Sequence, residues 1–211
     1  MGPETRAAGS EAMAARGIKA RVRELLSPAA RLAADLGISP TAITVAGLLL
    51  SAAAGLSLAT GHFLRAAVLL VLAGLCDVID GAAARAGNRA SASGAFLDST
   101  IDRYSEIVVL VGALHYYLVR SPGGPETGTS MGIALALAGS LMVSYARARA
   151  EAVGESCEVG VAERPERMII LIVGALLGRH AFRVAVWVLV GLSHLTAIHR
   201  VRHVLARTRA R

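Results

Sequence analysis

The sequence predicts an all-α integral membrane protein in which six transmembrane helices follow an N-terminal amphipathic interfacial helix. Hydrophobic residues make up 55% of the 211 residues and charged residues only 18%, with a mean hydropathy of +0.57. A soluble domain of this length needs more polar surface. The apolar residues also gather in separate segments, which alternate with polar connections. These segments lie at 42–60, 63–84, 95–119, 131–150, 165–178 and 183–201.

Two different stretches precede the first apolar segment. Residues 1–13 are rich in small and polar types, so we expect them to be disordered. From residue 14 to residue 36, apolar side chains recur at helical spacing with basic side chains between them. This pattern predicts an amphipathic helix that lies on an anionic membrane surface. The apolar positions are Ile18, Val22, Leu25, Leu26 and Leu32, and the basic ones are Arg16, Lys19, Arg21, Arg23 and Arg31.

The six apolar segments differ in how clearly they predict a membrane span. A spanning helix needs about 20 largely apolar residues, and the first four segments meet this length. The fifth segment is short, and the sixth begins directly after the sequence RHAFR. We expect two helices here, because one long helix would bury Arg179, His180 and Arg183 in the middle of the membrane at a cost of several kcal/mol.

The distribution of basic residues predicts the orientation. The net charge is +7, with 22 lysine and arginine residues. Six spans place both termini on one side, and only four basic residues then fall on the other side, namely Arg65, Arg120, Arg179 and Arg183. This asymmetry predicts cytoplasmic termini. Nucleic acid is not expected as a partner, because aromatic residues make up only 4% of the chain and no basic–aromatic motif occurs.

Four aspartates interrupt the apolar sequence where the second segment ends and the third begins. Their spacing places two of them on one face of each helix, together with small and basic residues. On the first helix this face holds Asp77, Asp80, Gly81, Ala84 and Arg85, and on the second it holds Gly94, Asp98 and Asp102. The polar connection AGNRASAS is short, so the two helices are expected to be antiparallel neighbours. Four carboxylates then face one shared space near the cytoplasmic surface.

Carboxylates a few ångström apart repel one another unless cations lie between them. An oxygen-only ligand set favours Mg²⁺ or Mn²⁺ over zinc, and such ions neutralise charge in phosphoryl transfer. Gly81 and Ala84 lack bulk, so a ligand could approach the helix there, and Arg85 could reach a phosphate. Two other interpretations stay open: an acidic hairpin neutralised by arginines, and a non-enzymatic ion-conducting or scaffold membrane protein. Cys76 and Cys157 share no metal-ligand spacing and are given no role.

Written out, residues 77–102 read D-x2-D-G-x2-A-R-x8-G-x3-D-x3-D. At every fixed position this pattern resembles the signature of the CDP-alcohol phosphotransferases, and residues 14–211 look like a single membrane domain of that family. The resemblance implies a six-helix, often dimeric membrane enzyme. Such an enzyme transfers a phosphatidyl-type group from a CDP-alcohol to a hydroxyl and releases CMP. CDP-diacylglycerol or a related CDP-lipid is the implied donor, and Mg²⁺ or Mn²⁺, with two ions expected, is the implied cofactor.

The resemblance also implies roles for individual residues. The residues that look like metal ligands are Asp77, Asp80, Asp98 and Asp102, and Asp102 also resembles the general base for the acceptor hydroxyl. The residues that resemble the CDP-alcohol site are Gly81, Ala84, Arg85, Thr41 and Thr44. Relatives often carry Asp or Asn directly after the proline of the turn before the first span. This chain has Thr41 there, which leaves the exact cytidine contacts open.

Two further stretches resemble a narrower group. SYARARAEAVG (144–154) and ERPERMII (163–170) are similar to stretches of the actinobacterial phosphatidylinositol-phosphate synthases and related archaeal ether-lipid enzymes. Those enzymes use inositol phosphate, held by basic residues that match Arg147, Arg167 and Arg200. The implied acceptor is therefore myo-inositol phosphate. Glycerol 3-phosphate, the acceptor of a phosphatidylglycerophosphate synthase, is the alternative because it also carries a phosphate. A homodimer in a prokaryotic inner membrane, with a cytoplasmic active site, is expected.

Overall fold

The computed structural model describes residue 28 and residues 37–86 and 91–209, and all secondary structure within these ranges is helical. The helices are α2 (Pro40–Ala59), α3 (Phe63–Ala86), α4 (Ala92–His115), the π-helical turn η1 (Tyr116–Arg120), α5 (Thr127–Ala152), α6 (Arg164–Leu176) and α7 (Arg179–Thr208). The all-α prediction is thus confirmed for the described part of the chain. The disordered stretch predicted at 1–13 and, apart from residue 28, the interfacial helix predicted at 14–36 lie outside the described residues.

Each predicted apolar segment corresponds to one α-helix, and the sequence around the helix starts explains where they begin. Ser39 precedes α2, and its hydroxyl oxygen accepts a hydrogen bond from the backbone N–H of Ala42 at 3.2 Å. Ser91 precedes α4 in the same way and accepts from Gly94 at 3.1 Å. Such side chains satisfy backbone donors that the first helical turn leaves unpaired.

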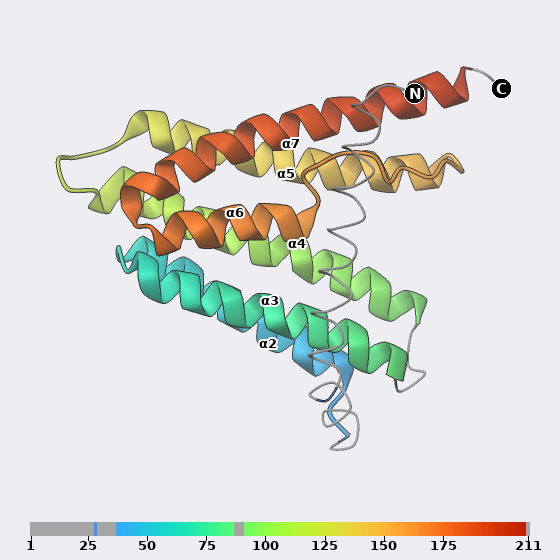
Figure 1. Cartoon of the computed structure of the whole chain (residues 1–211), viewed down its shortest axis with the longest axis horizontal. Coiled ribbons are helices and arrows are strands. Elements are labelled where there is room, and N and C mark those ends of the chain that lie inside the picture. Colours follow the sequence, from blue (N-terminus) through green and yellow to red (C-terminus); the bar gives the residue numbers. More distant parts are fainter. Residues whose placement is uncertain (1–27, 29–36, 87–90, 210–211) are drawn as a thin grey trace, which may run out of the picture. The chain divides into compact units, whose positions relative to one another are not determined.

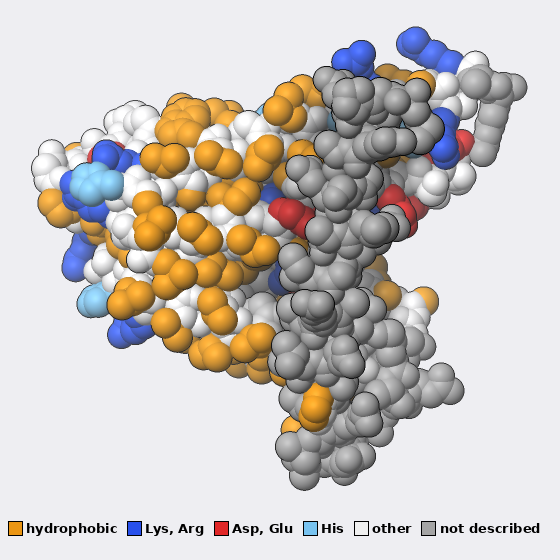
Figure 2. Space-filling model, viewed as in Figure 1, with side chains coloured by type: hydrophobic (Ala, Val, Ile, Leu, Met, Phe, Trp, Pro, Cys, Tyr) orange, Lys and Arg blue, Asp and Glu red, His pale blue; other side chains and the backbone are white. Residues whose placement is uncertain are grey.

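The fifth and sixth segments form two helices, as predicted. α6 ends at Leu176 and α7 begins at Arg179. Gly178 between them has φ +91°, a left-handed conformation that favours glycine. The turn places Arg179, His180 and Arg183 in the first turns of α7 instead of the middle of a long helix. Figure 2 shows basic and histidine side chains at the left of the view, where Figure 1 shows the start of α7.

Four of the described helices are long and apolar enough to cross a membrane: α2, α3 up to Ala83, α5 and α7. Large hydrophobic side chains such as Met142, Ile169 and Val188 are exposed, and Figure 2 shows hydrophobic side chains over much of the visible face. Exposed apolar surface of this extent suits contact with lipid. α6 has 13 residues, fewer than the about 20 that a full span needs. That α4 and α6 also cross the membrane stays a prediction.

The chain divides into two compact units. The first contains the described residues up to Ala46 and residues Leu75–Ser99, which are the start of α2, the end of α3 and the start of α4. The second contains Gly47–Gly74 and Thr100–Arg211. In the second unit α7 packs along α5 and against α6, as Figure 1 shows.

The core of the second unit combines aliphatic layers with an aromatic cluster. Leu58, Leu70, Leu110, Leu171 and Leu189 are each 0% exposed. The rings of Phe63, Tyr116, Tyr117 and Phe182 contact one another with centroid separations between 5.0 and 6.4 Å. The Tyr117 hydroxyl donates a 2.7 Å hydrogen bond to the backbone carbonyl of Arg179. Buried tyrosines need such a partner, and this one fixes the start of α7.

Two glycines bring helix backbones into direct contact. A methyl group placed on Gly112 of α4 would overlap the carbonyl oxygen of Gly55 on α2, and one placed on Gly55 would overlap the carbonyl oxygen of Val108. Small residues at such crossings let membrane helices approach closely. The second half of α2 is therefore held directly against α4, the helix that carries Asp102.

Candidate functional site

The first unit brings aspartates of α3 and α4 together. Asp77 and Asp80 are three residues apart on α3, so they lie on one helical face. Asp98 lies on α4, and carboxylate oxygens of Asp77 and Asp98 come within 4.8 Å of each other. Asp80 is buried, and its Oδ2 accepts a 2.8 Å hydrogen bond from the hydroxyl of Thr44 on α2. The predicted pairing of carboxylates from the two helices is thus found for Asp77 and Asp98.

The residues predicted for the CDP-alcohol site lie on α2, which carries Thr41 and Thr44, and on α3 after Asp80. Thr44 contacts Asp80, whereas Thr41, one turn earlier on α2, is exposed. Gly81 follows Asp80 directly on α3 and is partly buried. Ala84 and Arg85 belong to the last turns of α3; Ala84 and Arg85 side chains lie outside the described part of the structure.

The aspartates of the first unit fit a hard divalent cation. The ligand atoms on offer are carboxylate oxygens, the type that Mg²⁺ and Mn²⁺ prefer. The negative charges of Asp77 and Asp98 repel each other at this separation, and a divalent ion would relieve the repulsion. The hydrogen bond from Thr44 orients one oxygen of Asp80. Outer partners of this kind commonly fix metal-binding carboxylates.

The second unit contains Asp102, one helical turn after Asp98 along α4. Its Oδ1 lies 2.9 Å from Nη2 of Arg164, the first residue of α6. Its Oδ2 lies 3.6 Å from Nη2 of Arg103, whose other terminal nitrogen donates to the Ser144 hydroxyl on α5. Asp102 is 13% exposed, so it remains within reach of a bound molecule.

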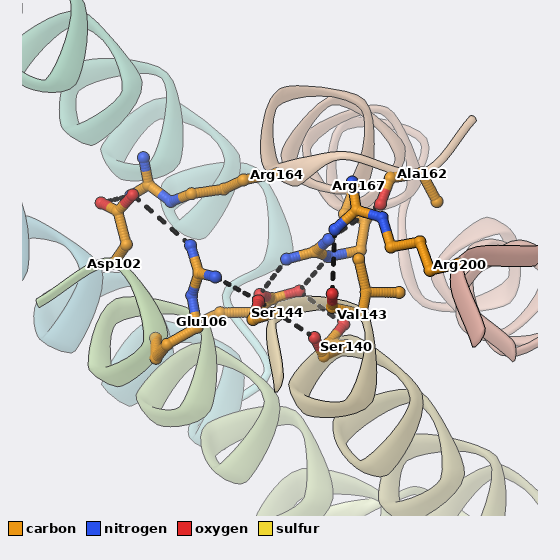
Figure 3. Close-up of polar contacts among 10 residues, drawn as sticks. Asp102, Glu106, Ser140, Val143, Ser144, Ala162, Arg164, Arg167 and Arg200 are labelled. Carbon is orange, nitrogen blue, oxygen red and sulfur yellow. Dashed lines mark hydrogen bonds and ion pairs between the residues drawn. The ribbon is translucent and has the colours of Figure 1, made fainter. Parts of the chain in front are cut away.

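One turn further along α4, Glu106 forms a buried ion pair with Arg167 of α6. The Nε and Nη2 atoms of Arg167 donate to the two carboxylate oxygens of Glu106, both at 2.8 Å. Ser140 of α5 donates to the same carboxylate at 2.7 Å, and the Nη1 atom of Arg167 donates to the carbonyl of Ala162 at 2.9 Å. The side chains of Arg167 and Glu106 are only 1% and 3% exposed. Figure 3 shows the two neighbouring ion pairs in one view.

The three arginines predicted to hold an acceptor phosphate have different environments. Arg200 on α7 is buried and donates at 2.9 Å to the carbonyls of Val159 and Val143. Its Nη2 atom lies 3.8 Å from Glu163. Arg147 on α5 is 46% exposed, and its Nε donates to Glu151 at 3.1 Å. Among the three, Arg147 has the most accessible guanidinium, while Arg167 and Arg200 bind protein groups in this structure.

The sequence reasoning did not assign a role to Glu106, Arg164 or Ser140. A signal for Glu106 was present, because an acidic residue inside a predicted span is expensive and needs a partner. Glu106 also follows Asp102 by four residues, which places it on the same helical face. Arg164 lies in the stretch ERPERMII and among the basic residues of the predicted inner side, but no role was predicted for it. Nothing in its local pattern distinguished it from Arg149 or Arg202.

A comparison with protein-family models matches residues 37–198 to the CDP-alcohol phosphatidyltransferase family. The chain is also 40% identical over 190 residues to the archaetidylinositol phosphate synthase of Methanothermobacter thermautotrophicus, covering 88% of this chain and 91% of that one. It is 37% identical over 183 residues to the phosphatidylinositol phosphate synthase of Corynebacterium glutamicum, covering 84% and 82%.

Solved structures of similar fold include the phosphatidylinositol phosphate synthase of Mycobacterium tuberculosis. Its structure with CDP-DAG bound matches with a TM-score of 0.78 and 31% identity, covering 86% of this chain and 94% of that chain. Its complex with manganese and citrate matches with a TM-score of 0.77, covering 85% and 88%.

Proposed function

The chain belongs to the CDP-alcohol phosphatidyltransferase family, and from this premise we propose that it transfers a phosphatidyl-type group from a CDP-lipid to myo-inositol phosphate, releasing CMP. The observation that supports this most directly is the aspartate signature, whose members Asp77 and Asp98 meet in the first unit. The transferase activity follows from the family. The acceptor follows from the relatives, since the archaeal and actinobacterial synthases are named for different lipids but for the same inositol phosphate.

Asp77, Asp80 and Asp98 would hold Mg²⁺ or Mn²⁺, with Asp102 at the edge of the site and two ions expected. A divalent ion supplies charge neutralisation for the pyrophosphate of the CDP-lipid and for the departing CMP. The carboxylates would fix the position of an ion, and the hydrogen bond from Thr44 orients one oxygen of Asp80. A relative's structure with manganese is consistent with this choice of metal.

Asp102 is the proposed general base. The acceptor hydroxyl gives its proton to a carboxylate oxygen of Asp102 while its own oxygen attacks the phosphorus that carries the lipid. The bond from that phosphorus to the CMP oxygen then breaks, and CMP leaves with the electron pair. Arg164 holds Oδ1 of Asp102 at 2.9 Å and thereby orients the carboxylate. A positioned base of this kind commonly contributes about 10²–10⁴-fold to the rate.

The acceptor phosphate is proposed to bind near Arg147, Arg167 and Arg200. Arg147 is half-exposed, so its terminal nitrogens can donate to phosphate oxygens. Arg200 and Arg167 are held by carbonyl oxygens of the α5–α6 connection, which places positive charge behind that segment. The residues proposed to contact the CDP-alcohol are Thr41, Thr44, Gly81, Ala84 and Arg85.

The membrane arrangement is also part of the proposal. The four helices that can span a bilayer, together with α4 and α6, would form six spans with both termini in the cytoplasm of a prokaryotic cell. The excess of basic residues on that side supports this orientation. We also propose that residues 14–211 form one domain, that residues 14–36 form an interfacial helix and that the protein is a homodimer.

The purified protein with CDP-diacylglycerol, Mg²⁺ and a panel of acceptors tests the function through CMP release. We expect myo-inositol phosphate to give the highest kcat/KM, and glycerol 3-phosphate, free inositol and serine to be poor substrates. Omitting the acceptor controls for hydrolysis, and EDTA should abolish release. A higher kcat/KM with glycerol 3-phosphate would make the protein a phosphatidylglycerophosphate synthase. Preference for serine or free inositol would contradict the phosphate-pocket assignment.

A further inference from the structure

Two carboxylate–arginine pairs join α4 to α6, one helical turn apart. Asp102 and Glu106 are four residues apart on α4, and Arg164 and Arg167 are three residues apart on α6. Each carboxylate meets one arginine, at 2.9 Å for Asp102–Arg164 and at 2.8 Å for Glu106–Arg167. Figure 3 shows the two pairs side by side. Both spacings match one helical turn. The Glu106–Arg167 pair, the inner pair, therefore determines which residue of α6 faces Asp102 in the outer pair, Asp102–Arg164.

The two pairs differ in burial. Glu106 and Arg167 are 3% and 1% exposed, and they are bonded to each other through two parallel hydrogen bonds and to Ser140 and Ala162. Such a pair does not open easily, because separation leaves an uncompensated charge inside the protein. Asp102 and Arg164 are 13% and 17% exposed, so solvent or a substrate can reach both side chains. The buried inner pair is therefore suited to hold α6 in place against α4, whereas the side chains of the outer pair can contact a substrate.

We infer that Glu106 is a positioning residue for the reaction: through Arg167 it fixes the first turn of α6, so that Arg164 is held against Asp102. This inference rests on the proposed function, because it takes Asp102 as the group that accepts the proton. Glu106 itself is too buried to touch a substrate. Without the Glu106 carboxylate, the first turn of α6 shifts and Arg164 no longer points at Asp102. A displacement of about 1 Å at a reacting group can reduce a rate about 100-fold.

The first test is a double-mutant cycle with Glu106→Gln and Arg164→Gln, measured as kcat with saturating CDP-lipid and acceptor. Glutamine keeps the shape of Glu106 and an acceptor for Ser140, but it loses the charge that holds Arg167. Each single variant should lower kcat on the order of 10-fold or more, with the KM for the CDP-lipid little changed. The double variant should be no slower than the slower single variant, within about 2-fold, because both changes act through the same contact. If the double variant lowers kcat by the product of the two single reductions, or if Glu106→Gln leaves kcat unchanged, the inference is overturned.

The chain offers a closely matched control. Glu126 also accepts hydrogen bonds from a serine and an arginine, Ser121 at 2.6 Å and Arg183 at 3.0 Å, but it precedes α5. Glu126→Gln should leave kcat and the coupling to Arg164 unchanged. Should Glu106→Gln fail to fold, Ser140→Ala removes one hydrogen bond to Glu106 and should give the same non-additivity with Arg164→Gln at smaller amplitude.

A second readout does not depend on turnover. Hydrogen–deuterium exchange of residues 160–167 should rise in Glu106→Gln and stay at the wild-type level in Glu126→Gln. If the wild type releases no CMP with any acceptor, the proposed function fails, and the exchange result alone decides whether Glu106 fixes the start of α6. If the wild type is active and Glu106→Gln changes neither exchange nor kcat, the positioning role is excluded while the proposed function stands.

Discussion

The hydroxyl of Thr44 on α2 donates a 2.8 Å hydrogen bond to Oδ2 of Asp80 on α3, and it also lies 3.0 Å from the carbonyl of Pro40. The hydroxyl thus links the first turns of α2 to a buried carboxylate of the aspartate signature. Family resemblance assigns Thr44 to the CDP-alcohol, whereas this contact makes it a support for Asp80, a proposed metal ligand. The two assignments predict different kinetic effects.

Replacing Thr44 by valine should weaken divalent cation binding, because Asp80 loses the donor that orients its oxygen. Removing the hydrogen-bond partner of a metal ligand commonly reduces metal affinity about 10–100-fold. Mn²⁺ titration followed by electron paramagnetic resonance measures the affinity directly. Thr44→Ser retains the hydroxyl and should restore wild-type affinity. An unchanged Mn²⁺ affinity with a raised KM for the CDP-lipid would favour the CDP-alcohol assignment instead.

Replacing Asp102 by asparagine should lower kcat by about 10²–10⁴-fold, because the amide cannot accept the hydroxyl proton. Asp77, Asp80 and Asp98 remain, so Mn²⁺ and CDP-lipid binding should be largely retained. The matched comparison is Asp77→Ala, which should lose metal binding together with activity. Turnover near the wild-type rate in Asp102→Asn would remove Asp102 from the mechanism.

Replacing Arg147 by alanine should raise the KM for inositol phosphate on the order of 10-fold, corresponding to about 1.5 kcal/mol for one hydrogen bond to a charged group. The KM for the CDP-lipid should stay close to the wild-type value. Arg149 lies two residues further along α5 and is also exposed, so Arg149→Ala is the control and should leave both constants unchanged.

Arg167→Ala should behave differently from Arg147→Ala. It leaves the carboxylate of Glu106 buried without its main partner, and breaking a buried pair in this way costs about 3–5 kcal/mol. The thermal midpoint should therefore fall together with activity. A well-folded Arg167→Ala variant with only a raised acceptor KM would instead show that Arg167 acts mainly on the phosphate.

Replacing Gly112 by alanine should destabilise the fold, because the added methyl group overlaps the carbonyl oxygen of Gly55. Overpacking of this kind costs roughly 1–3 kcal/mol. The control is Gly191→Ala on α7, where an added methyl group meets nothing within 4 Å. That change should be neutral or slightly stabilising, since alanine favours helix more than glycine does. Equal thermal midpoints for the two variants would contradict the close approach of α2 and α4.

The ionised carboxylate of Glu126 is expected to make a pH-dependent contribution to the free energy of unfolding. The Ser121 hydroxyl, followed by Arg183 and Thr129, holds the pKa of the Glu126 carboxyl below its usual range. The contribution is therefore present above the ordinary glutamate value of about 4.3 and is lost as the pH falls through the lower folded value. Thermal midpoints of the wild type and Glu126→Gln should differ at neutral pH and converge in acid. If the two thermal midpoints still differ in acid, ionisation of Glu126 is not the cause of the difference.

The sequence predicted the helices because long apolar segments favour a structure that satisfies the backbone internally, and two final helices instead of one followed from the cost of burying Arg179 and Arg183 in a membrane. The break lies at Gly178, so α7 begins at Arg179, earlier than the predicted start at residue 183. The aspartate spacing likewise predicted that Asp77 and Asp98 would meet. Periodicity identifies the face of a helix but not the helix that it faces. The pairing of Glu106 with Arg167, 61 residues away, depends on α4 packing against α6, and no local pattern carries that information. For the same reason the burial of Arg200 against carbonyl oxygens was not foreseen.

The hydrogen bonds from Arg200 and Arg167 to the α5–α6 connection, residues 153–163, have a consequence for evolution. Both arginines donate to main-chain carbonyls of this segment, at Val159 and Ala162. Every amino acid supplies a carbonyl, so the hydrogen bonds impose no side chain at either position. Substitutions at residue 159 can therefore accumulate, within the limits of packing, without loosening the segment. The constraint falls on the two arginines, so neighbouring surface residues can diverge while the segment stays attached to α6 and α7.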